Sequence, residues 1–326
     1  MDLNLTIGGP QGGGIDTSSN MINRAFAAAG YNVLGVREYH SNIKGRHSYN
    51  HLRVKEERPR SLKYPVDILV ALDPDTIFEH LEDVGKGTKI VYDKAFESSD
   101  LNSARMIMRD TSIRIRKTLE SSGFPANIIG ALGYMKTKGG IPIPIPFSDV
   151  VTSAIKEGPA TRYFNTLGSA VTLAIAGVPQ EFSEEAIRQV FASKKNVAED
   201  NIKVVEAAYN YAESNNLSGK KLPKLEKKRR LLLTGNDGSA IGKLMGGLRF
   251  QTYYPITPAS DESSILEEHE DLRYFENEKA KLEEGGVVVV QTEDEISAVT
   301  MAQGAALTGT RSATATSGPG FSLMAE

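Results

Sequence analysis

The N-terminal part of the chain alternates short apolar runs with longer segments in which apolar residues recur at helical spacing. The apolar runs predict strands at residues 3–7, 32–36, 48–54, 67–73 and 88–92. The helical spacing predicts helices at residues 15–29, 74–83, 103–122, 164–177 and 183–213. Strands that alternate with helices are typical of an open α/β sheet with helices on its faces.

Residues 141–146 alternate isoleucine with proline. Each proline fixes its own φ and biases the preceding residue away from the helical region. This stretch is therefore predicted to be an extended, packed connector rather than a helix or a ligand site.

A polar stretch over residues 214–230 interrupts the pattern and ends in the basic run 227–230. No aromatic residues are interleaved with these cations, so we interpret the run as a solvated linker and not as an RNA-binding site. The sequence thus predicts one α/β domain at residues 1–213, a linker at 214–230 and a second domain at 231–326.

In the second domain, the apolar runs 231–234 and 287–290 predict strands, the second of them buried on both faces. Thr257 precedes Pro258, which predicts a helix that begins at a threonine N-cap with proline at the first helical position. That helix is expected to run through residue 268.

Glu295 opens a further predicted helix, and two interpretations of it stay open. The spacing from Thr292 to Glu295 matches a capping box, in which the carboxylate only supports the helix start. Alternatively, Glu295 has the catalytic role that a family resemblance, given below, implies; that role needs a carboxyl in an apolar pocket, where desolvation favours the protonated form and allows proton exchange near neutral pH. Ala298, Ala302 and Ala305/Ala306 follow at helical spacing, with Gly304 beside them, and this stripe of small residues lets another element approach the helix closely.

Two glycine-rich segments are considered as phosphate sites, and only the first stays a candidate. The run 8–14 connects a predicted strand to a predicted helix, and it presents backbone N–H groups to an anion or serves only as a tight turn. Its spacing fits neither a dinucleotide fingerprint nor a P-loop. The segment 235–243 is not a P-loop either, because Asp237 replaces the first glycine and Leu244 replaces the serine or threonine.

Composition narrows the function further. The chain has 326 residues and a net charge of −3, which gives no indication of nucleic-acid binding. It has neither an apolar run of membrane-spanning length nor a signal-peptide pattern, so we expect a cytoplasmic protein that does not enter a membrane. It has no cysteine, hence no disulfide, no thiol nucleophile and no ligand for an iron–sulfur cluster. His40, His47 and His51 lack the spacing of a metal site, and none is predicted.

The motif Tyr254–Pro258, the pattern of Glu295, Ala298 and Ala302, and the turn 317–320 resemble the pyrimidine-binding domain of thiamine diphosphate enzymes. Together they are closely similar to the α subunit of 2-oxoacid:ferredoxin oxidoreductases. Residues 1–213 resemble the γ component, through the glycine-rich first turn, the loop at Lys44-Gly45-Arg46 and the run Val66–Ala71. The order γ then α resembles the fused subunit of archaeal enzymes.

This resemblance implies roles for particular residues. Glu295 would be catalytic and would hydrogen-bond the aminopyrimidine of thiamine diphosphate, which Ser317 and Gly318 would also contact. The 2-oxoacid would be bound by Thr257 and its neighbours, namely Tyr254, Pro255, Ile256 and Pro258. Coenzyme A contacts are expected at the glycine-rich turn and the basic loop, that is, at Gly9, Gly12, Gly13, Lys44 and Arg46.

The implied reaction is the oxidative decarboxylation of a 2-oxoacid, pyruvate or 2-oxoglutarate, to acyl-coenzyme A and carbon dioxide, with ferredoxin as the electron acceptor. Asn236-Asp237-Gly238 is not followed by the asparagine that completes a diphosphate–magnesium motif. The resemblance therefore assigns Mg²⁺ and the [4Fe-4S] cluster to a partner β subunit, and no metal to this chain.

Two alternatives remain at this stage. An enzyme of the same superfamily that acts on aryl pyruvates would share every motif, and a non-catalytic scaffold that binds a nucleotide or coenzyme A would use Glu295 only as a cap. The resemblance also predicts that residues 231–326 cover only the first part of the pyrimidine-binding domain.

Overall fold

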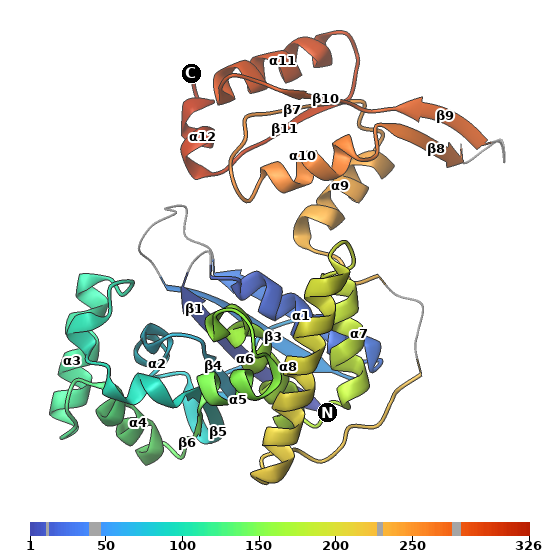
Figure 1. Ribbon diagram of the computed structural model, residues 1–326. Coiled ribbons are helices and arrows are strands. Elements are labelled where there is room, and N and C mark those ends of the chain that lie inside the picture. Colours follow the sequence, from blue (N-terminus) through green and yellow to red (C-terminus); the bar gives the residue numbers. More distant parts are fainter. Residues whose placement is uncertain (11–12, 39–46, 227–230, 276–281) are drawn as a thin grey trace. The chain divides into compact units, whose positions relative to one another are not determined.

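The computed structural model describes residues 1–10, 13–38, 47–226, 231–275 and 282–326. The chain divides into two compact units, Met1–Arg229 and Arg230–Glu326 (Figure 1). Each unit is an α/β fold with its own sheet and core, so the predicted fold class is confirmed. Among the described residues, no helix has the length and apolar character needed to cross a bilayer.

A six-stranded mixed sheet forms the centre of the first unit, in the order β2-β3-β1-β4-β5-β6. β1, β4, β5 and β6 are parallel, whereas β3 runs antiparallel to both β1 and β2. The strands are β1 (Asp2–Pro10), β2 (Asn32–Glu38), β3 (His47–Lys55), β4 (Val66–Ala71), β5 (Val84–Asp93) and β6 (Ile141–Ile145).

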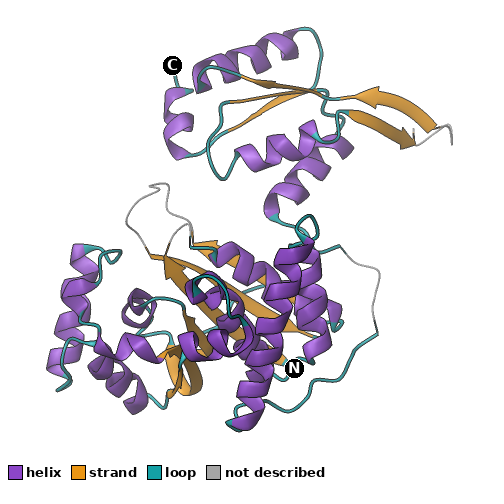
Figure 2. Ribbon diagram, viewed as in Figure 1, coloured by secondary structure: helices purple, strands orange, loops and turns teal. Residues whose placement is uncertain are grey.

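Helices cover both faces of this sheet (Figure 2). In β4, Ile68 and Val70 point into the core under α1 and α5–α8, while Leu69 and Ala71 point into the core under α2–α4, as the two-residue period of a strand requires. The helices are α1 (Ile15–Ala28), α2 (Pro74–Glu79), α3 (Arg109–Ser121), α4 (Ile128–Thr137), α5 (Phe147–Ala154), α6 (Phe164–Ile175), α7 (Gln180–Val190) and α8 (Lys195–Ser214). Short 3-10 turns lie at Lys94–Ser98, Leu101–Ser103 and Ala160–Tyr163.

The structure corrects three predicted helices of this unit. The helix predicted at 183–213 is two helices, because α7 packs on α1 and α8 packs on α6, and the chain must turn between them. The helix predicted at 103–122 begins only at Arg109, and the one predicted at 74–83 ends at Glu79. Upstream of α3, the Asp100 side chain accepts a hydrogen bond from the Asn102 amide, which favours a local turn over a longer helix.

Residues 141–145 are extended as predicted, and they form the edge strand β6 beside β5. Much of the predicted linker 214–230 packs against the first unit, which the sequence did not predict. Leu217, Leu222 and Leu225 pack on the core of the first unit, and the Leu225 amide donates a 3.0 Å hydrogen bond to the Ala29 carbonyl. Residues 215–226 therefore belong to the first unit, and residues 227–230 lie outside the described residues.

A three-stranded parallel sheet, in the order β10-β7-β11, forms the second unit. Its core on one face joins α9 and α10, and α11 packs on β7 from the other face through Ala298 and Ala302. The elements are α9 (Gly235–Met245), β7 (Phe250–Tyr253), α10 (Ser260–Glu267), β10 (Val288–Gln291), α11 (Glu295–Leu307), β11 (Ser312–Ala315) and α12 (Gly318–Leu323), with a separate hairpin of β8 (Asp271–Phe275) and β9 (Leu282–Gly286).

Two predicted strands of this unit need correction. Residues 231–234 form no strand; instead the Thr234 hydroxyl caps α9, in a reciprocal capping box with Asp237. Residues 288–291 do form β10, but the predicted burial on both faces was wrong: Val288 is 56% exposed, and Val289 and Val290 are only partly buried.

Candidate functional site

Three loops meet at one edge of the second sheet. In the parallel register, Tyr253 of β7 lies opposite Gln291 of β10 and Ala315 of β11, so the three strands end at the same level. Each strand is followed directly by one of the motif segments: 254–258 after β7, 292–295 after β10 and 316–320 after β11. The carboxyl edge of a parallel α/β sheet is where such folds bind ligands.

Glu295 is the first residue of α11, and it is buried, with 5% of its surface exposed. The predicted capping box is wrong, because Asp294 is the N-cap and accepts a 2.6 Å hydrogen bond from the Ser297 amide. That amide also holds the pKa of Asp294 below its usual value. The Thr292 hydroxyl instead donates to backbone carbonyls, so the helix start does not use the Glu295 carboxylate.

The Glu295 carboxyl lies against the turn that follows β11. A Cβ at Gly320 would lie 2.5 Å from Glu295 Oε1 and also against the Thr316 hydroxyl, so a side chain there would have to displace these groups. Among the described residues, none forms a hydrogen bond with the Glu295 carboxylate, and the buried hydroxyls of Thr316 and Ser317 have no partner either. Buried polar groups normally have partners. This arrangement therefore fits a ligand with both donor and acceptor atoms.

The segment 254–258 does not start a helix as predicted. The Thr257–Pro258 peptide is cis, and α10 begins at Ser260 after Ala259. The Thr257 hydroxyl consequently has no capping role in α10. Tyr254, Pro255, Thr257 and Pro258 are exposed, whereas Ile256 is partly buried.

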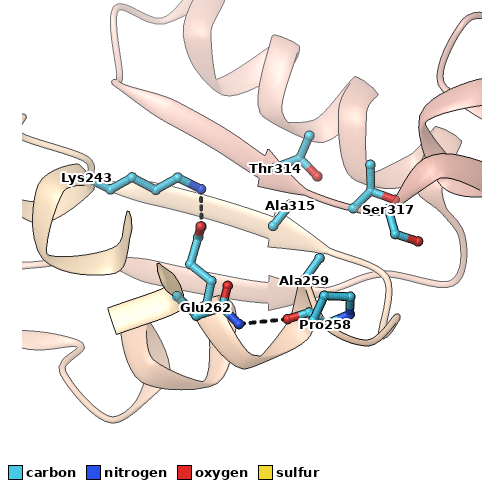
Figure 3. A pocket seen from close by; sticks show the side chains of 9 residues that line it. Lys243, Pro258, Ala259, Glu262, Thr314, Ala315 and Ser317 are labelled. Carbon is cyan, nitrogen blue, oxygen red and sulfur yellow. Dashed lines mark hydrogen bonds and ion pairs between the residues drawn. The ribbon is translucent and has the colours of Figure 1, made fainter. Parts of the chain in front are cut away.

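An open cavity of about 550 Å³ adjoins this segment on the side of α9 and α10 (Figure 3). Its lining residues are Asn236, Lys243, Pro258, Ala259, Glu262, Thr314, Ala315, Thr316 and Ser317. Thr316 and Ser317 connect the cavity wall with the surroundings of Glu295.

The residues predicted for coenzyme A lie in the first unit. Gly9 belongs to β1 and not to the turn, and a Cβ there would collide with Ile15. A Cβ at Gly13 would lie 2.8 Å from the Pro10 carbonyl oxygen. Packing thus explains both glycines. Gly12, Lys44 and Arg46 lie outside the described residues.

The histidines of the first unit pair with other side chains. His47 Nε2 lies 3.1 Å from His80 Nε2, and His51 Nδ1 lies 3.1 Å from the Tyr64 hydroxyl. Burial lowers the pKa of His51. No group of three or more potential metal ligands occurs within the described ranges, and His40 falls outside them.

Sequence reasoning missed the polar residues that support the site from α9 and α10. Asn236 and Lys243 drew attention only as parts of phosphate motifs that do not match, and Glu262 drew none. Their partners are Pro258, Gln251 and Ser239, which only the fold brings near.

Comparison with known proteins shows the family of the chain. The family described as pyruvate ferredoxin/flavodoxin oxidoreductase matches residues 4–211. The chain belongs to this family. The thiamine diphosphate-binding domain of pyruvate flavodoxin/ferredoxin oxidoreductase matches residues 241–326, so the oxidoreductase's two regions follow one another in one chain.

Similar oxidoreductases include two archaeal α subunits. The chain is 40% identical over 337 residues to 2-oxoacid:ferredoxin oxidoreductase 1, subunit alpha, of Sulfurisphaera tokodaii, covering all of this chain and 52% of that protein. It is 39% identical over 336 residues to subunit alpha of oxidoreductase 2 of Aeropyrum pernix, again covering all of this chain and 52% of the relative. The chain therefore spans about half the length of these relatives.

The fold is shared with a 2-oxoglutarate:ferredoxin oxidoreductase from Magnetococcus marinus, whose structure contains 2-oxoglutarate, coenzyme A and succinyl-CoA. The TM-score is 0.71 at 24% sequence identity, covering all of this chain and 49% of that one.

Proposed function

We propose that this chain is part of the α subunit, of the fused γ–α type, of a 2-oxoacid:ferredoxin oxidoreductase. The enzyme converts a 2-oxoacid, coenzyme A and oxidised ferredoxin to acyl-coenzyme A, carbon dioxide and reduced ferredoxin. The observation that carries the proposal is Glu295: a buried carboxylate without a described partner, next to the unpartnered hydroxyls of Thr316 and Ser317.

These residues fit one edge of thiamine diphosphate. Glu295 would hydrogen-bond the aminopyrimidine ring and exchange a proton with it, and Ser317 and Gly318, in the turn after β11, would contact the same ring. Gly320 keeps the space beside Glu295 free of a side chain. When bound, thiamine diphosphate supplies the carbon nucleophile that allows a 2-oxoacid to lose carbon dioxide.

The segment after β7 holds the substrate in this proposal. The hydroxyl of Thr257 is exposed and has no capping role in α10, so it is available to hydrogen-bond the 2-oxoacid. Tyr254, Pro255, Ile256 and Pro258 shape the surface around it. The names of the relatives make 2-oxoglutarate and pyruvate the first substrates to try.

A β subunit completes the site. The chain has no cysteine to ligate a cluster and no complete diphosphate–magnesium motif, so we assign the [4Fe-4S] cluster and Mg²⁺ to that partner. Coenzyme A contacts remain assigned to the first unit, at Gly9, Gly12, Gly13, Lys44 and Arg46.

The test is dye reduction by the full-length protein co-expressed with its β subunit, with pyruvate, 2-oxoglutarate and aryl pyruvates, with and without coenzyme A. We expect reduction that requires both the β subunit and coenzyme A. Activity with aryl pyruvates alone would favour that related enzyme. An assembled, cluster-loaded complex that reduces no dye with any 2-oxoacid would leave a scaffold role instead.

A further inference from the structure

We propose that Asn236, supported by the Lys243–Glu262 ion pair, is a positioning residue for the substrate segment 254–258. Together these three residues form a clasp from α9 and α10. The inference rests on the proposed function, because it assigns the clasp to the placement of Thr257 against the 2-oxoacid.

The direct contact of the clasp is one hydrogen bond. Asn236 Nδ2 donates to the Pro258 carbonyl oxygen over 2.9 Å (Figure 3). This carbonyl belongs to the residue that follows Thr257, so the bond restrains the backbone at the proposed substrate contact. The segment needs such a restraint, because Tyr254, Thr257 and Pro258 are exposed and packing holds them only weakly.

The first turn of α9 gives Asn236 a fixed base. The Thr234 amide donates to Asp237 Oδ2 over 2.7 Å, and the Asp237 amide donates to the Thr234 hydroxyl over 3.1 Å. This reciprocal capping box lies on either side of Asn236 in sequence. The capping box thus fixes the backbone of the helical turn that carries Asn236.

The ion pair ties α9 to the elements on both sides of the substrate segment. Lys243 Nζ pairs with Glu262 of α10, which follows the segment, and also donates over 3.2 Å to Gln251 Oε1 of β7, which precedes it. Glu262 is buried and accepts a further hydrogen bond from the Ser239 hydroxyl. The pair is partly buried, so loss of either partner would leave the other charge uncompensated and is expected to be destabilising.

A role in positioning differs from a role in helix stability, and aspartate at residue 236 separates the two. Asn236→Ala removes the donor, whereas Asn236→Asp also places a carboxylate against the Pro258 carbonyl. An acidic residue in the first turn of a helix is stabilising. If Asn236 acts only through helix stability, the KM of Asn236→Asp should be closer to wild type than that of Asn236→Ala. If it acts by positioning, the KM of Asn236→Asp should be no closer.

The experiment compares wild type, Asn236→Ala, Asn236→Asp and the control Asn196→Ala in the full-length complex with its β subunit. Asn196 is an exposed asparagine in the first turn of α8, which matches the helix position without the contact. Five quantities are measured: KM and kcat for the 2-oxoacid, exchange of the thiamine C2 hydrogen, deuterium uptake by the peptide 254–260 in the apo protein, and the melting temperature.

We expect Asn236→Ala to raise KM roughly fivefold, as the loss of one hydrogen bond implies, and to speed deuterium uptake by the peptide 254–260. The exchange of the C2 hydrogen, which depends on Glu295, should stay at the wild-type rate. Asn236→Asp should raise KM at least as much while melting no lower than Asn236→Ala. Asn196→Ala should match wild type throughout.

An unchanged KM in Asn236→Ala, or recovery in Asn236→Asp, overturns the clasp while the proposed function stands. If the wild-type complex uses no 2-oxoacid, the proposed function fails, and deuterium uptake alone decides the clasp. Faster uptake at 254–260 in Asn236→Ala than in Asn196→Ala then supports it, and equal uptake overturns it.

Discussion

At the scale of single residues, Glu295 is a buried acid whose side chain has no hydrogen-bond partner within the described part of the chain. Placing a carboxylate in such a site costs stability unless hydrogen bonds compensate it. Helix capping does not explain why residue 295 is a glutamate, since the preceding residue, Asp294, is the N-cap of α11. In the proposed function, a hydrogen bond to thiamine diphosphate would give Glu295 the partner that no described residue supplies.

Glu295→Gln should therefore reduce turnover by at least a hundredfold, because the amide keeps the shape of the side chain but cannot take up or release the proton. Glu293→Gln is the matched control, an exposed glutamate in the same loop. Steady-state dye reduction measures both variants. Equal rates in Glu295→Gln and Glu293→Gln would remove Glu295 from the chemistry.

Gly320→Ala tests the fit of the turn beside Glu295. Alanine in the short helix α12 gains about 1 kcal/mol of helix propensity, but its methyl group must displace the Glu295 carboxyl or the Thr316 hydroxyl. We expect at least a tenfold loss of thiamine diphosphate affinity, measured by calorimetry on the complex. Gly304→Ala, where a Cβ has open space, should keep the affinity and raise the melting temperature slightly.

At the scale of elements, side-chain caps decide where several helices begin. Asp73, Asn127, Thr234 and Asp294 each accept a hydrogen bond from a backbone amide in the first turn of the helix that follows. Two of these helices were predicted, and they begin where expected, at Pro74 and Glu295. α11, for example, starts from Asp294 and so turns Glu295 into the interior.

The cap of α2 predicts a pH dependence of stability. Burial raises the pKa of Asp73 from 3.8 to about 6, despite its hydrogen bonds from Thr76. The folded state therefore favours protonated Asp73, and this stabilisation is present below pH 4 and lost as the pH rises through 6. Asparagine caps equally well and carries no charge.

Asp73→Asn should consequently raise the free energy of unfolding at pH 7.5 by on the order of 1–3 kcal/mol, and by little at pH 4. Melting curves of both proteins across this range give the measurement. A stabilisation that is the same at both pH values would show that Asp73 ionisation is not its cause.

The sequence predicted the elements whose buried side chains are apolar. The strands around Ile7, Val70 and Val91 and the helix of Met21 and Ile22 follow simple periodicity, and each contributes to the core. The central strand β7 escaped prediction because its buried residues Gln251 and Thr252 are polar. Their partners, such as the Ala298 carbonyl, come from distant parts of the chain.

The candidate site likewise has parts that the sequence predicted and parts that it could not predict. Glu295, Thr257 and the turn at 316–320 could be predicted because their short motifs resemble a known family. The conformation around Thr257 could not, since a threonine before a proline suggests a helix cap and the structure has a cis peptide there instead. Asn236 could not be found either, because its contact with Pro258 exists only after α9 folds beside the loop.

At the scale of the whole molecule, the boundary between the two units lies later than the end of α8. The Tyr31 hydroxyl donates a 3.0 Å hydrogen bond to the Pro223 carbonyl, and the Leu222 amide donates over 2.7 Å to the Gly177 carbonyl. Residues 215–226 thus add hydrogen bonds and apolar cover to the first unit.

A fragment of residues 1–226 should accordingly melt higher than a fragment of residues 1–213. Leu217, Leu222 and Leu225 are partly buried, and together they contribute on the order of 3 kcal/mol, which corresponds to roughly 5–10 °C at this size. Differential scanning calorimetry of both fragments tests this. Equal melting temperatures would mean that the segment only rests on the surface.

The alternating prolines of β6 have a consequence for solubility. Since β6 is an edge strand and its prolines lack N–H groups, hydrogen bonds to β5 must come from Ile141, Ile143 and Ile145. Pro142 and Pro144 then face outward, where an ordinary strand would offer donors to another chain. This edge of the sheet therefore resists strand addition, and an aggregate growing by β-pairing finds no template there.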